Sequence, residues 1–211
     1  MVELDETEMN SIKLRLGGLW DILKTPNFYW HATTIERFRE IYSFGIQPSD
    51  GKIKSDYPNS LGSYFRSVCL FNFFGVSEKL AFGFEDCWGC FLVGDNSAKV
   101  FIEIKAEYLK SDYLIHQKHN TYVSLQESND SAKYKNHIPH VENWYTQPIL
   151  KEVIQKIIII KHFERPFEYK ILYNSDNLLE KIERINIEWL SLEKVKREEN
   201  RKSRKFPHLI F

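Results

Sequence analysis

The chain has 211 residues, of which 43% are hydrophobic, 15% aromatic and 27% charged. Its 29 basic residues balance its 29 acidic residues, so no overall charge identifies a nucleic-acid-binding or membrane-surface protein. The length predicts a single domain over residues 1–211. No apolar run approaches the ~18 residues of a membrane span, and the acidic start is unlike a secretory signal, so we expect a cytoplasmic protein without membrane partners.

The N-terminal quarter contains the clearest local pattern. Residues 8–24 predict a short helix that is broken near two glycines. Three aromatic residues at 28–30 then predict a strand. Apolar residues at intervals of three and four predict a helix from residue 35, with Thr33 or Thr34 as its N-cap and Gly45 at its end.

The middle of the chain alternates loops with apolar runs of strand length. Residues 49–67 are rich in turn formers and predict a surface loop. The continuous apolar run at 67–74 predicts a strand that is covered on both faces and is therefore central. Residues 91–93 and 100–104 predict two further strands joined by a turn-rich connection.

The C-terminal part changes from strand to helix patterns. Residues 110–140 are loop-rich, with a short strand over 122–125. The β-branched run at 156–161 predicts a strand, and the pattern from residue 174 predicts an amphipathic helix. We therefore predict an α+β fold with a core over 26–165 and a charged helical C-terminal extension over 174–211.

The predicted C-terminal helix ends in a basic segment. Residues 193–205 contain seven basic and three acidic residues. Such a segment is most often a solvated helix face, and the alternative is that it contacts phosphate groups.

The cysteines and paired histidines do not predict a metal site. The chain has three cysteines, an odd number that fits a reducing compartment. Cys87 and Cys90 have zinc-like spacing, but a structural zinc site needs four ligands and the chain has no second pair. His137 and His140 flank Pro139, which excludes a helix, and no acid beside them completes a ligand set.

Several familiar catalytic motifs are absent from the sequence. It contains no phosphate-binding Gly-Lys-Ser/Thr loop, no Gly-x-Gly-x-x-Gly, no Gly-x-Ser-x-Gly and no two-histidine metal helix. Three candidates remain: His31 with Thr33 at a strand end, Arg66 just before a strand, and Glu142 ahead of an apolar segment. Polar residues at strand ends are well placed to meet a ligand.

At these three candidates the sequence resembles a known family. Residues 29–46 resemble the opening of ADP-ribosyltransferase folds, particularly the DarT group of nucleic-acid-modifying toxins, in which strand, His-x-Thr, helix and Gly-Leu recur. Residues 66–73 are similar to that group's second core strand with its preceding arginine, and residues 141–154 to the segment that bears its catalytic glutamate. The three segments lie in the family's order within residues 28–160.

The resemblance implies a fold and an activity. The fold is an ADP-ribosyltransferase-like split antiparallel β-sheet core with flanking helices and a C-terminal amphipathic helix. The activity is that of an NAD-dependent ADP-ribosyltransferase that cleaves the nicotinamide–ribose bond and modifies a nucleic-acid or protein acceptor, as in a toxin or phage-defence effector. NAD is then a substrate, and no metal is implied.

The resemblance also implies roles for particular residues. Glu142 would stabilise the positive charge that develops on the ribose when the bond to nicotinamide breaks. Arg66 would act with it by holding a phosphate. The predicted NAD-binding residues are His31, Ala32, Thr33, Tyr64 and Phe71, with the histidine on the ribose hydroxyls and an aromatic ring on the nicotinamide.

Each candidate also has a purely structural interpretation. A strand-end histidine is often satisfied by the backbone, and most glutamates and arginines are surface residues. At the level of function, three alternatives stay open: an RNA 2′-phosphotransferase, an NAD glycohydrolase on the same fold, and a non-catalytic module that binds ADP-ribose or a nucleotide.

Overall fold

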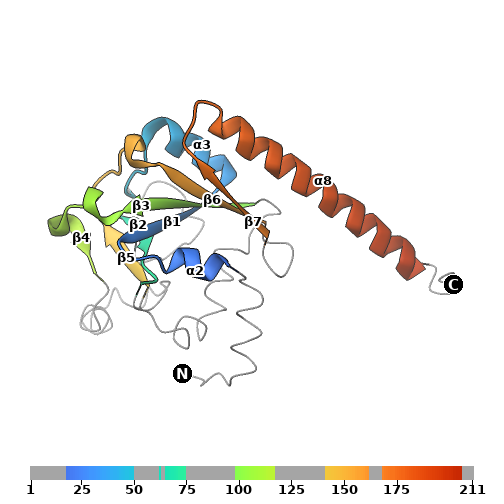
Figure 1. Ribbon diagram of the computed structural model, residues 1–211, viewed down its shortest axis with the longest axis horizontal. Coiled ribbons are helices and arrows are strands. Elements are labelled where there is room, and N and C mark those ends of the chain that lie inside the picture. Colours follow the sequence, from blue (N-terminus) through green and yellow to red (C-terminus); the bar gives the residue numbers. More distant parts are fainter. Residues whose placement is uncertain are drawn as a thin grey trace, which may run out of the picture.

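The protein has an α+β fold built on one seven-stranded antiparallel sheet (Figure 1). The computed structural model describes residues 18–49, 62, 65–74, 98–116, 141–161 and 168–205. The strand order across the sheet is β4-β5-β2-β1-β3-β6-β7. The strands are β1 (Phe28–Thr34), β2 (Val68–Phe71), β3 (Lys99–Lys105), β4 (Leu114–Ile115), β5 (Glu142–Tyr145), β6 (Lys156–Lys161) and β7 (Glu168–Tyr173).

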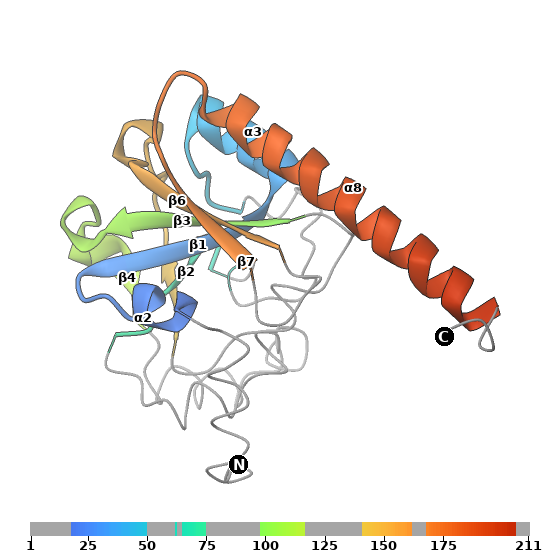
Figure 2. The same cartoon turned by 45° about the vertical axis from the view of Figure 1, so that its right-hand side comes forward.

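Helices cover both faces of this sheet. Helices α3 (Ile35–Phe44) and α8 (Leu178–Lys205) lie side by side over one face, and the short α2 (Leu19–Leu23) lies over the other (Figures 1 and 2). Short 3-10 turns connect strands; they span Ala106–Tyr108, Ser111–Tyr113 and Lys151–Val153. Within the described parts of the chain, no helix has the length and hydrophobicity that a membrane span requires.

The sheet separates two apolar layers. On the face of α3 and α8, strand residues such as Leu70 and Ile102 pack with Phe38 and Trp189 from the helices. On the α2 face, Trp30 and Phe71 belong to a second cluster with the apolar side chains of α2. Alternate residues of each strand therefore serve different layers, as the period of two in a strand requires.

Helix α3 begins and ends where the sequence predicts. The Thr34 side chain accepts a hydrogen bond from the Arg37 backbone N–H and so satisfies one free donor of the first turn. At the other end Gly45 has a φ of 77°, a value that suits glycine. Its N–H donates to the Ile41 carbonyl. The helix thus follows β1 after a turn of minimal length, which fixes the end of β1 in space.

The sheet is weakly joined between β1 and β2. Strands β1 and β3 pair over seven consecutive residues, from Phe28 to Thr34 on β1. Strands β1 and β2 share one registered pair, Trp30 with Phe71. The backbone ladder between these two described strands does not continue past that pair, and we call this break in the ladder the opening between β1 and β2.

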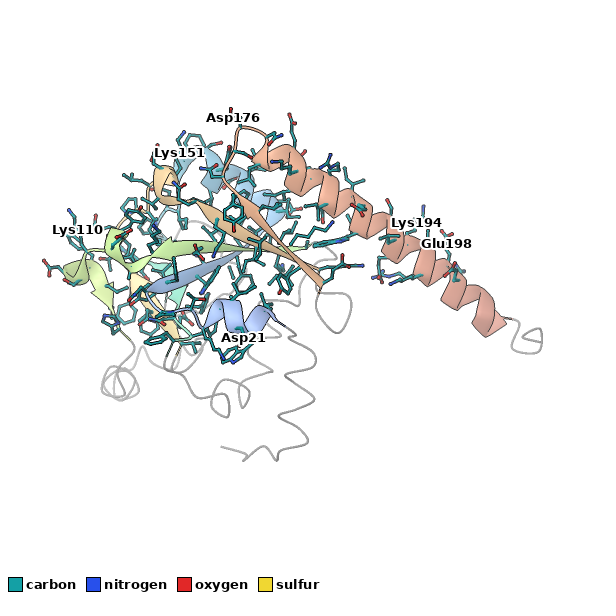
Figure 3. All side chains as sticks on the ribbon, viewed as in Figure 1. Asp21, Lys110, Lys151, Asp176, Lys194 and Glu198 are labelled. Atoms are coloured by element: carbon teal, nitrogen blue, oxygen red, sulfur yellow. The ribbon has the colours of Figure 1, made fainter. Side chains whose placement is uncertain are left out.

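Helix α8 has an anchored half and a projecting half. Leu178, Ile182, Ile185 and Trp189 are buried against the sheet. The Trp189 indole also donates to Glu168 Oε1 at 3.1 Å. Beyond Trp189 the helix continues past the edge of the sheet, and Lys194 and Glu198 lie on this part (Figure 3). The amphipathic pattern thus describes the first half, whereas the second half is exposed on most sides.

Most predicted elements are confirmed in kind and corrected in length. The strands at 156–161 and 100–104, helix α3 and the C-terminal helix are present. The strand expected over 67–74 is shorter, because only Val68–Phe71 pairs. Strand β7 was not expected; it is an edge strand whose residues are mostly half-exposed, so it lacks a clear alternation of burial. The predicted strands at 91–93 and 122–125 and the loop over 50–61 lie outside the described residues.

Candidate functional site

Strand β2 brings two predicted site segments together. Phe71 on β2 pairs with Trp30 on one side and with Glu142 on the other. His31 and Glu142, more than a hundred residues apart in sequence, are therefore separated by one strand. With a strand spacing of ~4.8 Å, their backbones lie about 10 Å apart.

The two side chains start from opposite faces of the sheet. Glu142 pairs with Phe71, so it lies on the α2 face. His31 pairs with Ile102 and lies on the α3 face. Among the described strands, the break in the backbone ladder between β1 and β2 lies between these two residues.

His31 fills part of the opening with its own ring. Its Nδ1 lies 3.0 Å from the Cys69 carbonyl oxygen, where a continuous ladder would place a backbone N–H. A carbonyl oxygen only accepts, so Nδ1 must carry the proton. Burial lowers the pKa of His31 below its ordinary value of 6.5; the hydrogen bond to Cys69 acts in the opposite direction, and the charge of Arg37 adds to the lowering. Neutral His31 thus has Nε2 as an acceptor for a hydroxyl group.

Glu142 is a buried carboxylate held by neutral donors. Its exposed fraction is 4%. The Trp144 indole Nε1 donates to Glu142 Oε1 at 2.9 Å, and the Cys69 thiol forms a second hydrogen bond to the carboxylate. A buried carboxylate requires such partners. Neither of these two donors carries a charge.

Cys69 is the residue that contacts both predicted groups. Its carbonyl accepts from His31, and its thiol faces Glu142. Burial of the thiol, followed by the charge of Glu142 and the hydrogen bond to it, raises the pKa of Cys69 well above its ordinary value; a hydrogen bond from the Gly62 backbone opposes this. The thiol is therefore protonated at neutral pH and can act as a donor.

The expectation that His31 lies at a strand end is wrong, because β1 continues to Thr34 and His31 is the fourth of its seven residues. The other predicted residues of β1 follow it in the same strand. Ala32 is half-buried and packs in the layer under α2. Thr33 is half-buried and, by alternation, lies on the face of His31. Thr34 rather than Thr33 caps α3. The threonine of the His-x-Thr motif is thus left for another contact.

Arg66 does not lie beside Glu142. Glu142 pairs at the Phe71 end of β2, whereas Arg66 precedes Val68 at the other end, about 10 Å or more away along the strand. Arg66 is exposed and has a φ of 48°, a left-handed conformation that costs a non-glycine residue of order 1 kcal/mol. Its neighbour Phe65 does approach the site, because its ring centroid lies 5.0 Å from that of Trp144.

Phe71 and Tyr64 are the two aromatic residues that were predicted to bind NAD. Phe71 has an exposed fraction of 3%, and its ring stacks on Phe73 with centroids 6.3 Å apart. Its ring is therefore part of the core under α2, and a stacking role on nicotinamide would require Phe73 or its neighbours to move. Tyr64 lies outside the described residues, as do the paired cysteines at 87 and 90 and the histidines at 137 and 140.

Two residues of the site were missed by sequence reasoning. Sequence reasoning assigns no role in the site to Trp144 or Cys69. The spacing Glu142-x-Trp144 on a strand places both side chains on one face, and this signal was present in the sequence. The position of Cys69 opposite Trp144 depends on the β2–β5 register, which only the structure supplies.

A smaller polar pair lies on the opposite face at the β5 edge. Asn143 is buried, and its Oδ1 lies 3.2 Å from His116 Nδ1. The Asn143 amide nitrogen donates to the Val141 carbonyl. These hydrogen bonds join the residue that follows β4 to β5, and they hold the backbone next to Glu142. Across the described residues, no three side chains of His, Cys, Asp or Glu gather as a metal site would require.

Comparison with known proteins does not assign the chain to a family. No family model matches the sequence, and no curated protein is similar enough to count as a relative.

Proposed function

We propose that the protein is an NAD-dependent ADP-ribosyltransferase whose catalytic carboxylate is Glu142. The observation that supports this best is the buried, doubly hydrogen-bonded carboxylate of Glu142, one strand away from a neutral histidine at an opening in the sheet. Burying a carboxylate costs free energy, so a buried carboxylate held in a defined orientation is suited to stabilising developing positive charge.

The reaction fits the charge of this site. The bond between ribose C1′ and the nicotinamide nitrogen breaks, and its electron pair leaves with the nicotinamide. The ribose then carries oxocarbenium-like positive charge, which the Glu142 carboxylate stabilises through space and through the ribose hydroxyls. An acceptor oxygen or nitrogen forms the new bond to C1′ and loses its proton to a base, a role that Glu142 can also perform.

His31 would hold the ribose on the other side of the opening. Its Nε2 accepts from a hydroxyl while Nδ1 stays engaged with Cys69. Ala32 and Thr33, the next two residues of β1, would line the dinucleotide. Because His31 and Glu142 start from opposite faces, the proposal requires NAD to enter between β1 and β2.

Arg66 would meet a more distant part of the dinucleotide. It lies at the far end of β2 from Glu142, so its guanidinium suits the phosphates or the acceptor rather than the reacting carbon. Its left-handed backbone is consistent with a functional constraint at this position. No role on the nicotinamide is proposed for Phe71, because its ring is enclosed in the core.

A nucleic acid is the acceptor that the charge of α8 favours. On the projecting half of α8, Lys194, Arg197 and Arg201 are spaced at three and four residues and are exposed. They line one hollow along the helix together with Glu193 and Glu198, so three basic and two acidic residues give this face a net charge of +1. We propose that its basic side chains contact a phosphate backbone. A protein acceptor is the other outcome that the experiments below distinguish.

The proposal is tested by incubating the protein with NAD labelled in the ribose or the adenine. Nicotinamide release with label transferred to added DNA or RNA supports the transferase. Nicotinamide release with free ADP-ribose as the only product indicates a glycohydrolase. Binding of NAD with no release of nicotinamide, under conditions in which the protein is folded, contradicts the catalytic proposal and leaves a binding module.

A further inference from the structure

The indole of Trp144 holds the Glu142 carboxylate in one orientation. The two residues lie at positions i and i+2 of β5, so their side chains project from the same face. Trp144 Nε1 lies 2.9 Å from Glu142 Oε1, and both residues are nearly inaccessible to solvent. A hydrogen bond between a buried donor and an ionised acceptor is among the stronger ones in a protein. This hydrogen bond fixes the position of one carboxylate oxygen. The direction in which the other oxygen points is then fixed as well.

The indole is itself held in place on two sides. The Phe65 ring packs against it with centroids 5.0 Å apart. Trp144 also pairs with Cys69 in the β2–β5 register, and the Cys69 thiol reaches the same carboxylate. The Glu142 carboxylate thus accepts hydrogen bonds from donors on two paired strands, β5 and β2. Groups on strands are positioned more rigidly than groups on loops.

The chemical identity of the donor matters for the reaction. An arginine or lysine at position 144 would also orient Glu142, but it would cancel the charge that the oxocarbenium-like ribose needs. An indole N–H orients the carboxylate and remains neutral, since it has no accessible ionisation. An indole also donates in one fixed direction, whereas the flexible ammonium group of a lysine can donate in several.

We infer that Trp144 is a positioning residue for Glu142, acting through its indole N–H on the carboxylate of the proposed reaction. This inference rests on the proposed function for its catalytic consequence, but the orientation of the carboxylate can be measured without NAD. The Cys69 thiol provides that second readout, because a carboxylate held beside it suppresses formation of the thiolate.

The test compares Trp144→Phe with the matched control Trp189→Phe. Each substitution keeps an aromatic ring in a buried site and removes one indole donor from a glutamate, Glu142 in the first case and Glu168 in the second. We expect Trp144→Phe to lower kcat for nicotinamide release about 10- to 100-fold, the effect of losing a hydrogen bond to a charged group. The KM for NAD should stay within about twofold, and Trp189→Phe should leave both constants unchanged.

The thiol readout uses a protein whose other two cysteines are replaced by serine. With Trp144→Phe the carboxylate loses the indole hydrogen bond and should shift relative to Cys69, so alkylation by iodoacetamide at pH 8 should become several-fold faster, whereas Trp189→Phe should leave the rate unchanged. A folded Trp144→Phe protein with wild-type kcat and wild-type alkylation rate overturns the inference. Absence of NAD cleavage by the wild-type protein contradicts the proposed function alone, and the alkylation rates then decide the positioning role.

Discussion

The Cys69 thiol donates a hydrogen bond to the carboxylate of Glu142 across the β2–β5 pair. This contact joins two residues that are 73 positions apart in the chain. Through its carbonyl, Cys69 also meets His31 Nδ1. The proposed ribose-binding and catalytic groups are therefore linked through one residue of β2. A substitution at any of the three residues should alter the position or the pKa of the other two.

Removing the Glu142 charge should make Cys69 more reactive. Burial comes first among the causes that raise the pKa of Cys69, and the carboxylate comes second. Glu142→Gln keeps the shape and removes the charge, so the fraction of thiolate at pH 8 should increase. In the protein with Cys69 as its sole cysteine, we expect several-fold faster alkylation by iodoacetamide.

Glu168→Gln is the control for this measurement. Glu168 accepts from Trp189 on the α8 side of the sheet, far from Cys69 in the strand order. Its loss should not change the alkylation rate. Equal rates for the wild-type and Glu142→Gln proteins would mean that the thiol and the carboxylate are not neighbours in solution.

Protonation of His31 should destabilise the fold. Burial lowers its pKa in the folded state below 6.5, whereas the unfolded chain has the ordinary value. The unfolded state therefore binds more protons between these two values. The contribution of neutral His31 to stability is complete above pH 6.5 and is lost as the pH falls through the lower folded-state value.

Denaturant unfolding at pH 7.5 and pH 5 checks this pH dependence. His31→Gln cannot titrate and can still donate to the Cys69 carbonyl. We expect the wild-type protein to lose more unfolding free energy than His31→Gln on going from pH 7.5 to pH 5. A larger loss in the variant would show that His31 is protonated when folded.

Gly45 should be intolerant of a side chain. Its φ of 77° is a conformation that L-residues rarely adopt. A Cβ added there would collide with the Ile149 carbonyl oxygen, which accepts from the Ile46 N–H in the bridge that ties the end of α3 to the chain after β5. We expect Gly45→Ala to lower the unfolding free energy by about 2 kcal/mol or more. Ser43→Ala, two residues earlier and exposed, should change it by less than about 0.5 kcal/mol in the same thermal or denaturant experiment.

The elements that follow a local rule were predictable from the sequence. Helix α3 has a capping threonine, an apolar stripe and a terminal glycine, and each of these acts over a few residues. Strand β6 is four isoleucines between two lysines, a composition that favours a buried strand. The α+β class follows from the mixture of such elements.

The relationships between strands were not predictable in the same way. Nothing local states that Phe71 pairs with both Trp30 and Glu142, because register depends on contacts between distant parts of the chain. For the same reason the sequence could propose His31 and Glu142 but not the opposite faces from which they start. The displacement of Arg66 to the far end of β2 is a consequence of the same register.

The basic face of α8 should contribute to nucleic-acid binding. Arg197→Gln with Arg201→Gln removes two charges from the projecting half of the helix; Arg197 also pairs with Glu193 at 2.9 Å, so its loss releases that carboxylate as well. Lys110→Gln with Lys151→Gln removes two charges from the exposed body of the protein (Figure 3). We expect the first pair to weaken binding to a DNA or RNA oligonucleotide and to reduce the slope of log K against log salt by about 2.

The body variant should retain the affinity and the salt slope of the wild-type protein. If both double variants bind equally well, phosphate contacts are not made by α8, and a protein acceptor becomes the better proposal. Fluorescence anisotropy over a range of salt concentrations measures both quantities in one experiment.

Release of nicotinamide from NAD by the wild-type and Glu142→Gln proteins tests the central proposal most directly. Glu142→Gln keeps an acceptor oxygen for the Trp144 indole, so the fold should be retained, as circular dichroism and thermal unfolding can verify. We expect measurable release by the wild-type protein and a loss of at least about 100-fold in kcat for Glu142→Gln, because the charge that stabilises the ribose is gone. Undiminished release by a folded Glu142→Gln protein would contradict the role assigned to this carboxylate.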